Sequence, residues 1–230
     1  MELSNRLNWI INKLDKCETI MDVGTDHGYI PIYLIKNNIA KKVIASDINK
    51  SPLEKAKINA KLENISDKID LRLGGGLEPL NLNEAQVVII AGMGGNLIRD
   101  ILENDIDKVN NLEYLVLQPA QNPEVLREYL YKNNYEILDE DLCFDEGKYY
   151  ELFKVRYKKG DYINLEPIFY EISPVLLNKK SDILKEYIED KIRNYKKISN
   201  FILDNTEHAI SRKNELKEKI KRLEDLKKNL

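Results

Sequence analysis

Residues 20–30 read Ile-Met-Asp-Val-Gly-Thr-Asp-His-Gly-Tyr-Ile, and the rest of the chain can be interpreted outward from them. The apolar run that ends at Val23 predicts a buried strand, and the segment 29–37 predicts a helix directly after it. Gly24 lets the chain turn sharply between the two, and Gly28 lets the start of the helix pack closely. Together they predict a cofactor-binding α/β domain, although a purely structural turn would have the same pattern.

The acidic residues of this turn indicate which cofactor it binds. Asp26 stands where a dinucleotide-binding turn has its middle glycine, so its charge would repel a pyrophosphate. It could instead accept a hydrogen bond from an ammonium group, and Asp22 adds a second acid at the strand end. The pair therefore favours S-adenosylmethionine, which has a cationic amino-acid end and no phosphates.

The next strand is expected at 42–46, and Asp47 follows it. An acid at this strand end, about twenty residues beyond the glycine turn, is placed to bind the ribose hydroxyls of the cofactor. A strand-end cap is the alternative role for Asp47, and Ile48 beside it is assigned to the same cofactor site. Ser51 and Glu54 form a capping box that predicts the start of another helix.

A glycine-rich stretch follows the predicted strand 69–73. Gly74 and Gly75 begin it, and their bare backbone can closely approach the flat adenine ring of a cofactor. A loose connector between two strands is the alternative interpretation of these glycines.

The nearly continuous apolar strand 86–91 is expected to carry the reaction centre at its carboxyl end. Ala91 and Gly92 are assigned to the cofactor site there. Met93 offers a soft surface against which an incoming base can pack, with a position in the core as its alternative. Gln118, after the following strand, is expected either to hydrogen-bond a base edge or to form a turn.

The remaining segments predict two domains. The strands 135–144 and 148–157 are joined by a short link that predicts an antiparallel hairpin, so residues 1–160 are expected to form a Rossmann-like class I methyltransferase sheet. In 161–230, two apolar series at helical spacing with a break at 204–206 predict an α-helical coiled-coil hairpin. This pattern fits a dimer seam and a rigid arm equally well.

The composition restricts the kind of protein further. The net charge is −3, but residues 178–230 hold 15 Lys and Arg against 10 Asp and Glu. This basic tail suits nucleic-acid phosphates, although lysine-rich helical faces are also often only solvated. Two cysteines indicate neither a disulfide framework nor a zinc site, and no apolar run is long enough to span a membrane. A cytoplasmic protein with no metal and no membrane segment is therefore expected. Its first helix is predicted by apolar residues at helical spacing: Leu3, Leu7, Ile10, Ile11 and Leu14.

Five pieces of the chain resemble the TrmK family, bacterial tRNA (adenine-N1)-methyltransferases that modify adenine 22 of tRNA. They are Asp-Val-Gly-Thr-Asp-His-Gly-Tyr-Ile-Pro (22–31), Gly-Gly-Gly-Leu (74–77), Ala-Gly-Met-Gly-Gly (91–95), Leu-Gln-Pro (117–119) and Gly-Lys-Tyr-Tyr-Glu (147–151). The likeness covers the whole length, including the helical C-terminal extension. It implies a cytoplasmic enzyme with S-adenosyl-L-methionine as cofactor and tRNA as partner.

Methylation of adenine N1 would leave a cationic base, which suggests roles within the site. Asp26 is the candidate for stabilising the developing charge, with binding of the cofactor's ammonium group as its competing role. Tyr29 and Met93 are expected to line the target base. His27 is expected to shape the cofactor loop, with a hydrogen-bonded turn residue as the alternative. Gly75 departs from the wider fold, which often has a side chain there that reaches the adenine amino group.

The tRNA substrate has further consequences. Its adenine N1 must be exposed by extrusion or local opening, and the basic C-terminal arm is expected to hold the tRNA. A monomer is expected, with a homodimer through the C-terminal helices as the alternative. Two other hypotheses stay open: an S-adenosylmethionine-dependent enzyme that acts on a protein or small molecule, and a non-catalytic RNA-binding protein with the same fold.

Overall fold

The computed structural model describes residues 3–160, 162–204 and 206–230. The chain divides into two compact units, Met1–Asn164 and Leu165–Leu230. The first unit contains the glycine turn and every residue that the sequence assigns to the cofactor or to the target base. The second unit contains the whole basic tail, residues 178–230.

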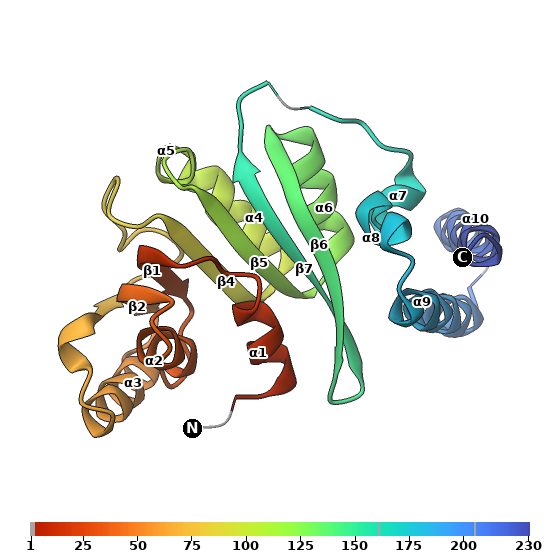
Figure 1. Cartoon of the computed structure of the whole chain (residues 1–230). Coiled ribbons are helices and arrows are strands. Elements are labelled where there is room, and N and C mark those ends of the chain that lie inside the picture. The colour runs from red at the N-terminus through yellow and green to blue at the C-terminus, as the bar shows by residue number, and fades with distance from the viewer. Residues whose placement is uncertain (1–2, 161, 205) are drawn as a thin grey trace. The chain divides into compact units, whose positions relative to one another are not determined.

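A seven-stranded sheet forms the centre of the first unit (Figure 1). Its strands are β1 (Cys17–Val23), β2 (Ala40–Asp47), β3 (Ile69–Leu73), β4 (Val87–Gly94), β5 (Tyr114–Gln121), β6 (Tyr135–Asp145) and β7 (Lys148–Tyr157). Within the described part of the chain the order is β3-β2-β1-β4-β5-β7-β6. Strands β1 to β5 run parallel, whereas β7 is antiparallel to β5 and β6 is antiparallel to β7. The predicted Rossmann-like sheet that ends in a hairpin is confirmed.

Helices cover both faces of this sheet, because its parallel strands are apolar on both sides. They are α1 (Asn5–Ile11), α2 (Tyr29–Lys36), α3 (Lys50–Leu62), α4 (Gly95–Asn104), α5 (Ile106–Val109) and α6 (Pro123–Lys132), with one 3₁₀ turn, η1 (Ser66–Lys68). One core cluster contains Ile10 of α1 with Ile20 of β1. The other contains Ile98 of α4 and Leu126 of α6 with Ile90 of β4.

Helix α3 begins earlier than its sequence signal predicts. Its first residue is Lys50 and its N-cap is Asn49, so Ser51 lies inside the helix and the predicted capping box is wrong. The reason is local, since the Asp47 carboxylate accepts a hydrogen bond from the Asn49 N–H at 2.7 Å and turns the chain directly after β2. The helix therefore starts before Ser51 can act as its cap.

Helix α1 is attached along the hairpin. The Trp9 indole donates to Asp141 of β6 at 3.2 Å, and Lys13 forms an ion pair of 3.1 Å with Asp139. The backbone N–H of Arg6 donates to Asp145, the last residue of β6, at 3.2 Å. These bonds fix the first turn of α1 at the carboxyl edge of the sheet.

The second unit, Leu165–Leu230, is helical. Its helices are α7 (Pro167–Glu171), α8 (Pro174–Lys179), α9 (Asp182–Phe201) and α10 (Glu207–Lys228). Helices α9 and α10 pack together as a hairpin, with an ion pair of 2.8 Å between Lys196 and Glu224. The sequence predicts this pair of helices, while coiled-coil packing stays a prediction. Residue 161, where the sequence begins this domain, and Asn205, in the expected break, lie outside the described residues.

A buried carboxylate stabilises the second unit. Glu171, at the end of α7, is 3% exposed. Lys191 and the Tyr195 hydroxyl of α9 donate to it at 3.2 Å and 2.5 Å, and Lys219 of α10 forms a further ion pair with it. One carboxylate therefore connects three helices of this unit.

Candidate active site

The glycine turn brings the end of β1 close to the end of β4. Gly24 has φ of +76°, a backbone conformation that favours glycine. The N–H groups of Gly24 and Thr25 donate to the Ser46 carbonyl of β2 at 2.9 Å and 2.8 Å. A Cβ placed on Gly24 would lie 2.5 Å from the terminal methyl of Met93. The predicted sharp turn is present, and it places Gly24 and Met93 in contact.

Gly28 serves the packing of α2. It is the N-cap of that helix, with φ of +70°. A Cβ at this position would lie 2.9 Å from the Cβ of Ala56 on α3. The close packing predicted for Gly28 is therefore present, while its place in the cofactor site stays a prediction.

His27 stacks on Tyr29 within the turn. Their ring centroids are 5.3 Å apart and the planes differ by 8°. The His27 Nε2 atom lies 3.4 Å from Asp26 Oδ1 and 3.4 Å from the Lys55 ammonium. The His27 carbonyl accepts from Asn59 at 2.9 Å. These contacts hold the turn in shape, and they leave one face of Tyr29 covered by an imidazole.

A cavity of about 110 Å³ lies at the ends of β1 and β4. It collects five of the residues that the sequence assigns to the site, together with two residues of α1. Its lining consists of Arg6, Leu7, Asp22, Gly24, Asp26, Tyr29, Ile30 and Ala91. The two acids of the glycine turn therefore line one cavity with the candidate base-contacting Tyr29.

The two acids differ in their surroundings. Asp22 is 4% exposed, whereas the side chain of Asp26 is 79% exposed. Burial raises the pKa of Asp22 to about 6, and the nearby Thr25 hydroxyl offsets this only in part. Among the described residues, no cation forms an ion pair with Asp22. A cationic ligand in the cavity would supply the missing partner.

The ends of β2 and β3 form the second part of the site. The Gly74 N–H donates to the Asp47 carbonyl at 3.0 Å, so the two strand ends are joined. Ile48 is 71% exposed, and a Cβ on Gly75 would lie 3.3 Å from its side chain. The structure thus brings Asp47, Ile48, Gly74 and Gly75 together as the sequence predicts. They combine a carboxylate with an open apolar surface.

The carboxyl end of β4 forms the third part of the site. The pairing of β4 with β5 shifts register on both sides of Met93, so the strand bulges there. Gly92 has φ of +81°, which favours glycine. Met93 is partly buried and packs against one core cluster, as its alternative role anticipates, while its terminal methyl reaches Gly24. Met93 therefore joins the core to the cavity.

The sequence did not indicate Arg6, which lies at the centre of this edge. Its Nη1 donates to Gln118 Oε1 at 2.6 Å, and its guanidinium lies 5.4 Å from the ring centroid of Tyr150. Gln118 is fully buried and also donates to the Pro119 carbonyl at 2.7 Å, so it does not face a base edge. The contact joins residues 112 positions apart, and no local pattern could reveal it.

The arrangement fits a nucleoside that carries an amino-acid end. Asp47 suits ribose hydroxyls, the exposed Ile48 suits a flat base, and the acids of the cavity suit an ammonium group. The hydroxyl of Ser46, at the end of β2, is buried and has no hydrogen-bond partner in the part of the chain that the structure describes. No group of three His, Cys, Asp or Glu among the described residues could hold a metal ion. The fold and this edge together define a class I methyltransferase.

Similarity to known proteins identifies the family within that class. Residues 20–225 match the family TrmK, described as tRNA (adenine(22)-N(1))-methyltransferase. The Bacillus subtilis enzyme of that name is 38% identical over 152 residues, which are 66% of this chain and 64% of that enzyme. Its crystal structure is similar over 98% of both chains, with a TM-score of 0.86 and 30% identity.

Two related structures contain ligands. M. capricolum TrmK, in complex with S-adenosyl-homocysteine, is similar over 98% of this chain and 99% of that chain, with a TM-score of 0.84 and 31% identity. Streptococcus pneumoniae Sp1610, in complex with S-adenosyl-L-methionine, is similar over the same shares of the two chains, with a TM-score of 0.83 and 28% identity.

The chain belongs to the tRNA (adenine(22)-N(1))-methyltransferase family. Membership confirms the predicted family, the enzyme class and S-adenosylmethionine as the cofactor. The roles of the individual site residues stay predictions. None of the described helices is both long enough and apolar enough to cross a membrane.

Proposed function

We propose that this chain transfers the methyl group of S-adenosylmethionine to N1 of adenine 22 in tRNA. The observation that carries the proposal is the single cavity that Asp22, Asp26 and Tyr29 share beside Ala91, at the carboxyl ends of β1 and β4. Ligands of doubly wound sheets bind at this edge. Because the substrate is tRNA, we place the protein in the cytoplasm.

The chemistry requires positioning more than a strong base. S-adenosylmethionine, when bound, supplies a methyl group on a positively charged sulfur. Adenine N1 has an in-plane lone pair that forms the new bond, while the electrons of the carbon–sulfur bond stay with sulfur. The positive charge passes to the base, and no proton has to leave. The exposed Asp26 is placed to stabilise that charge, whereas the buried Asp22 is better placed for the ammonium group.

Tyr29 and Met93 are proposed to contact the target base. One face of Tyr29 is occupied by His27, so the base would meet the other face or the edge. Met93 approaches Gly24 with a flexible thioether, which can adapt to a flat ring. Tyr29 is the first residue of α2 and Met93 lies at the end of β4, and the two side chains are proposed to hold the base between them.

The test uses labelled S-adenosylmethionine and two unmodified tRNA transcripts, the natural one and one with guanine at position 22. Nucleoside analysis should find the label as 1-methyladenosine only in the natural transcript. If neither transcript is labelled, although calorimetry shows that the protein binds the cofactor, the substrate proposal is wrong. The methyl acceptor would then be a protein or a small molecule.

The second unit is proposed to bind the tRNA backbone through α10. Lys213, Lys217 and Lys221 recur every four residues and therefore lie along one side of that helix. None of the three bonds to another residue in the described part of the chain, and Lys217 and Lys221 are exposed. These unpaired ammonium groups are available for phosphates.

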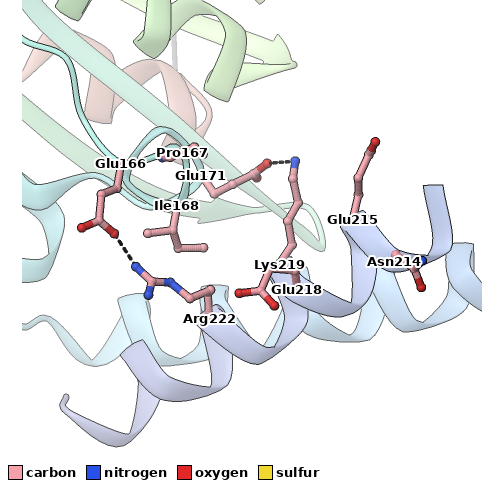
Figure 2. Close-up of a pocket in the computed structure, with 9 residues that line it drawn as sticks. All are labelled: Glu166, Pro167, Ile168, Glu171, Asn214, Glu215, Glu218, Lys219 and Arg222. Atoms are coloured by element: carbon pink, nitrogen blue, oxygen red, sulfur yellow. Dashed lines mark hydrogen bonds and ion pairs between the residues drawn. The ribbon is translucent and has the colours of Figure 1, made fainter. Parts of the chain in front are cut away.

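Two other surfaces of the second unit are less suitable. One is a cavity of about 500 Å³, whose lining includes Glu215 and Glu218. Figure 2 shows that the two cations in this lining, Lys219 and Arg222, are each bonded to a carboxylate. A groove of about 540 Å³ between α9 and α10 is richer in cations, but most of these are paired with acids on the helices. Phosphates would have to displace those acids.

A matched pair of double variants tests this surface. Lys217→Ala with Lys221→Ala should weaken tRNA binding about tenfold and reduce the slope of log affinity against log salt by about 2. The control is Lys57→Ala with Lys61→Ala, an exposed pair at the same spacing on α3. Equal tRNA affinity for the two double variants would contradict the proposal. In that case the helices would serve packing or dimerisation, which analytical ultracentrifugation can detect.

A further inference from the structure

The turn of the β6–β7 hairpin is flanked by two aromatic rings, Phe144 and Tyr149. They are direct partners across the two strands, and their ring centroids are 4.7 Å apart. Phe144 is 50% exposed and Tyr149 is half-buried. Neighbouring exposed apolar side chains are typical of an interaction surface. We call this pair of rings the aromatic hairpin end; it includes part of the stretch 147–151, which resembles the family.

The aromatic hairpin end lies at the edge of the sheet that carries the candidate active site. Strand β7 is antiparallel to β5, so the first residues of β7 lie beside the carboxyl end of β5. The pairing of β7 with β5 reaches Phe153, whereas its pairing with β6 continues to Lys148. The turn therefore extends past the neighbouring strands, as Figure 1 shows.

Arg6 connects the hairpin to the cavity of the active site. Its guanidinium lies 5.4 Å from the ring centroid of Tyr150, the residue after Tyr149, and it lines the cavity together with Tyr29. The backbone N–H of Arg6 donates to Asp145, beside the turn, at 3.2 Å. One side chain thus separates the hairpin from the cavity, and helix α1 holds the turn in place.

The size of the substrate determines what meets this surface. The cavity of about 110 Å³ admits no more of a tRNA than the base to be methylated, so the adjoining nucleotides must lie on the surface around it. Extrusion of the target adenine leaves the bases beside it without one of their stacking partners. RNA-binding proteins bind such unstacked bases on aromatic side chains.

The charges of the turn favour a base over a phosphate as the contact. Asp145 and Glu146 precede Gly147, and Lys148 follows it, so two carboxylates stand against one ammonium group. A phosphate would be repelled by this excess of negative charge. The face of a base is uncharged and can stack on the exposed ring of Phe144.

We propose that the aromatic hairpin end stacks on a base next to the target adenine when that adenine is extruded. Phe144 meets the base, and Tyr149 supports the Phe144 ring from the opposite strand. Stacking at this place offsets part of the cost of extrusion. The proposal rests on tRNA as the substrate of the proposed function, and it assigns to the sheet unit a tRNA contact outside the cavity.

Variants of Phe144 distinguish stacking from simple apolar contact. Phe144→Leu keeps an apolar side chain but removes the ring, so it should raise the KM for tRNA about tenfold. The affinity for S-adenosylmethionine, measured by calorimetry, should not change. Phe144→Trp keeps a ring and should restore the KM. The control is Leu138→Ala, an exposed apolar residue near the opposite end of the same strand, which should leave the KM unaltered.

A fluorescent base reports the stacking directly. Two tRNA transcripts carry 2-aminopurine, whose emission is quenched by stacking, on one or the other side of adenine 22. With saturating unaltered protein, the emission should stay low at one of these positions. With saturating Phe144→Leu, the emission at that position should rise, because the extruded adenine then leaves the base without a partner.

The outcomes separate this inference from the proposed function. If Phe144→Leu leaves both the KM and the emission unchanged while the unaltered protein forms 1-methyladenosine, the inference is wrong and the proposed function stands. If Phe144→Leu leaves the KM unchanged but alters sedimentation of the free protein, the aromatic hairpin end joins two copies of the chain, which also overturns the inference. If the unaltered protein methylates no tRNA, the proposed function fails and the inference fails with it.

Discussion

Two arginines of the sheet unit, Arg127 and Arg6, differ in how their charge is satisfied. Arg127 of α6 is fully buried, donates to Glu140 at 2.9 Å and 2.7 Å, and also forms an ion pair with Glu151. Arg6 is half-buried and has a neutral amide and an aromatic ring as neighbours. A charge that is satisfied within the chain belongs to the scaffold, whereas an unsatisfied one at the sheet edge indicates a ligand.

The same contrast separates the acids. Glu171 of the helical unit is buried among Lys191, Lys219 and Tyr195. Asp22 is equally buried but lies in a cavity where no cation of the described residues forms an ion pair with it. Burying a charge is unfavourable unless a partner compensates it, so the two acids should respond to substitution and to pH in opposite ways.

The largest effect is expected at Arg127. Arg127→Ala leaves Glu140 and Glu151 buried without their cation, which should lower the free energy of unfolding by about 3–5 kcal/mol. Urea denaturation followed by circular dichroism measures this change. Arg6→Gln provides the comparison, since it leaves no buried acid unpaired and should lower stability much less. Equal losses for the two variants would remove the distinction between scaffold and ligand-binding arginines.

Glu171 is expected to give the next largest effect. Burial alone would raise its pKa, but Lys191 and Lys219 outweigh burial and lower the pKa to about 2, from 4.5. The folded state therefore holds the carboxylate ionised, and this stabilisation is present above pH 4.5 and is lost as the pH falls toward 2. Glu171→Gln should be less stable than the unaltered protein by about 3 kcal/mol at neutral pH, a gap that should close in acid. A gap that is independent of pH between 5 and 2 would contradict this account.

Asp26 is expected to affect turnover more than binding. Asp26→Ala should lower the single-turnover rate of methyl transfer about 100-fold, because the charge on the base would lose its stabilising carboxylate. The affinity for the cofactor, measured by calorimetry, should fall less. Equal losses in rate and affinity would assign Asp26 to the ammonium group instead.

Asp22 is expected to produce the smallest effect, visible as a pH dependence. Burial raises its pKa to about 6, so the free protein holds it protonated below that pH. An ammonium ligand requires the carboxylate, and S-adenosylmethionine should therefore bind about tenfold more weakly at pH 5 than at pH 7. Asp22→Asn should remove this dependence. The stability of the fold should change with pH in the opposite direction to the affinity for the cofactor. Ionisation of the buried Asp22 carboxylate disfavours the folded state, so the free energy of unfolding should fall as the pH rises from 3.8 to 6.

The sequence predicts those parts of the site that depend on local signals. Gly24, Asp47 and Gly92 each follow an apolar run, and the end of a buried strand can be recognised from its own residues. The ion cluster of Arg127 and the contact between Arg6 and Gln118 depend on how distant segments pack, so their residues carry no local mark. Ser51 shows the reverse error, because a strong local capping signal was overridden by a hydrogen bond that Asp47 makes.

The most direct test of the account is a crystal structure of this chain with S-adenosylhomocysteine, which keeps the nucleoside and both charged groups of the cofactor's amino acid. The account predicts the ribose hydroxyls on Asp47, the adenine beside Ile48 and Gly75, and the amino-acid end in the cavity beside Asp22. A nucleoside bound away from Asp47, or an amino-acid end outside that cavity, would contradict the claim that the unsatisfied charges of the sheet edge form the cofactor site.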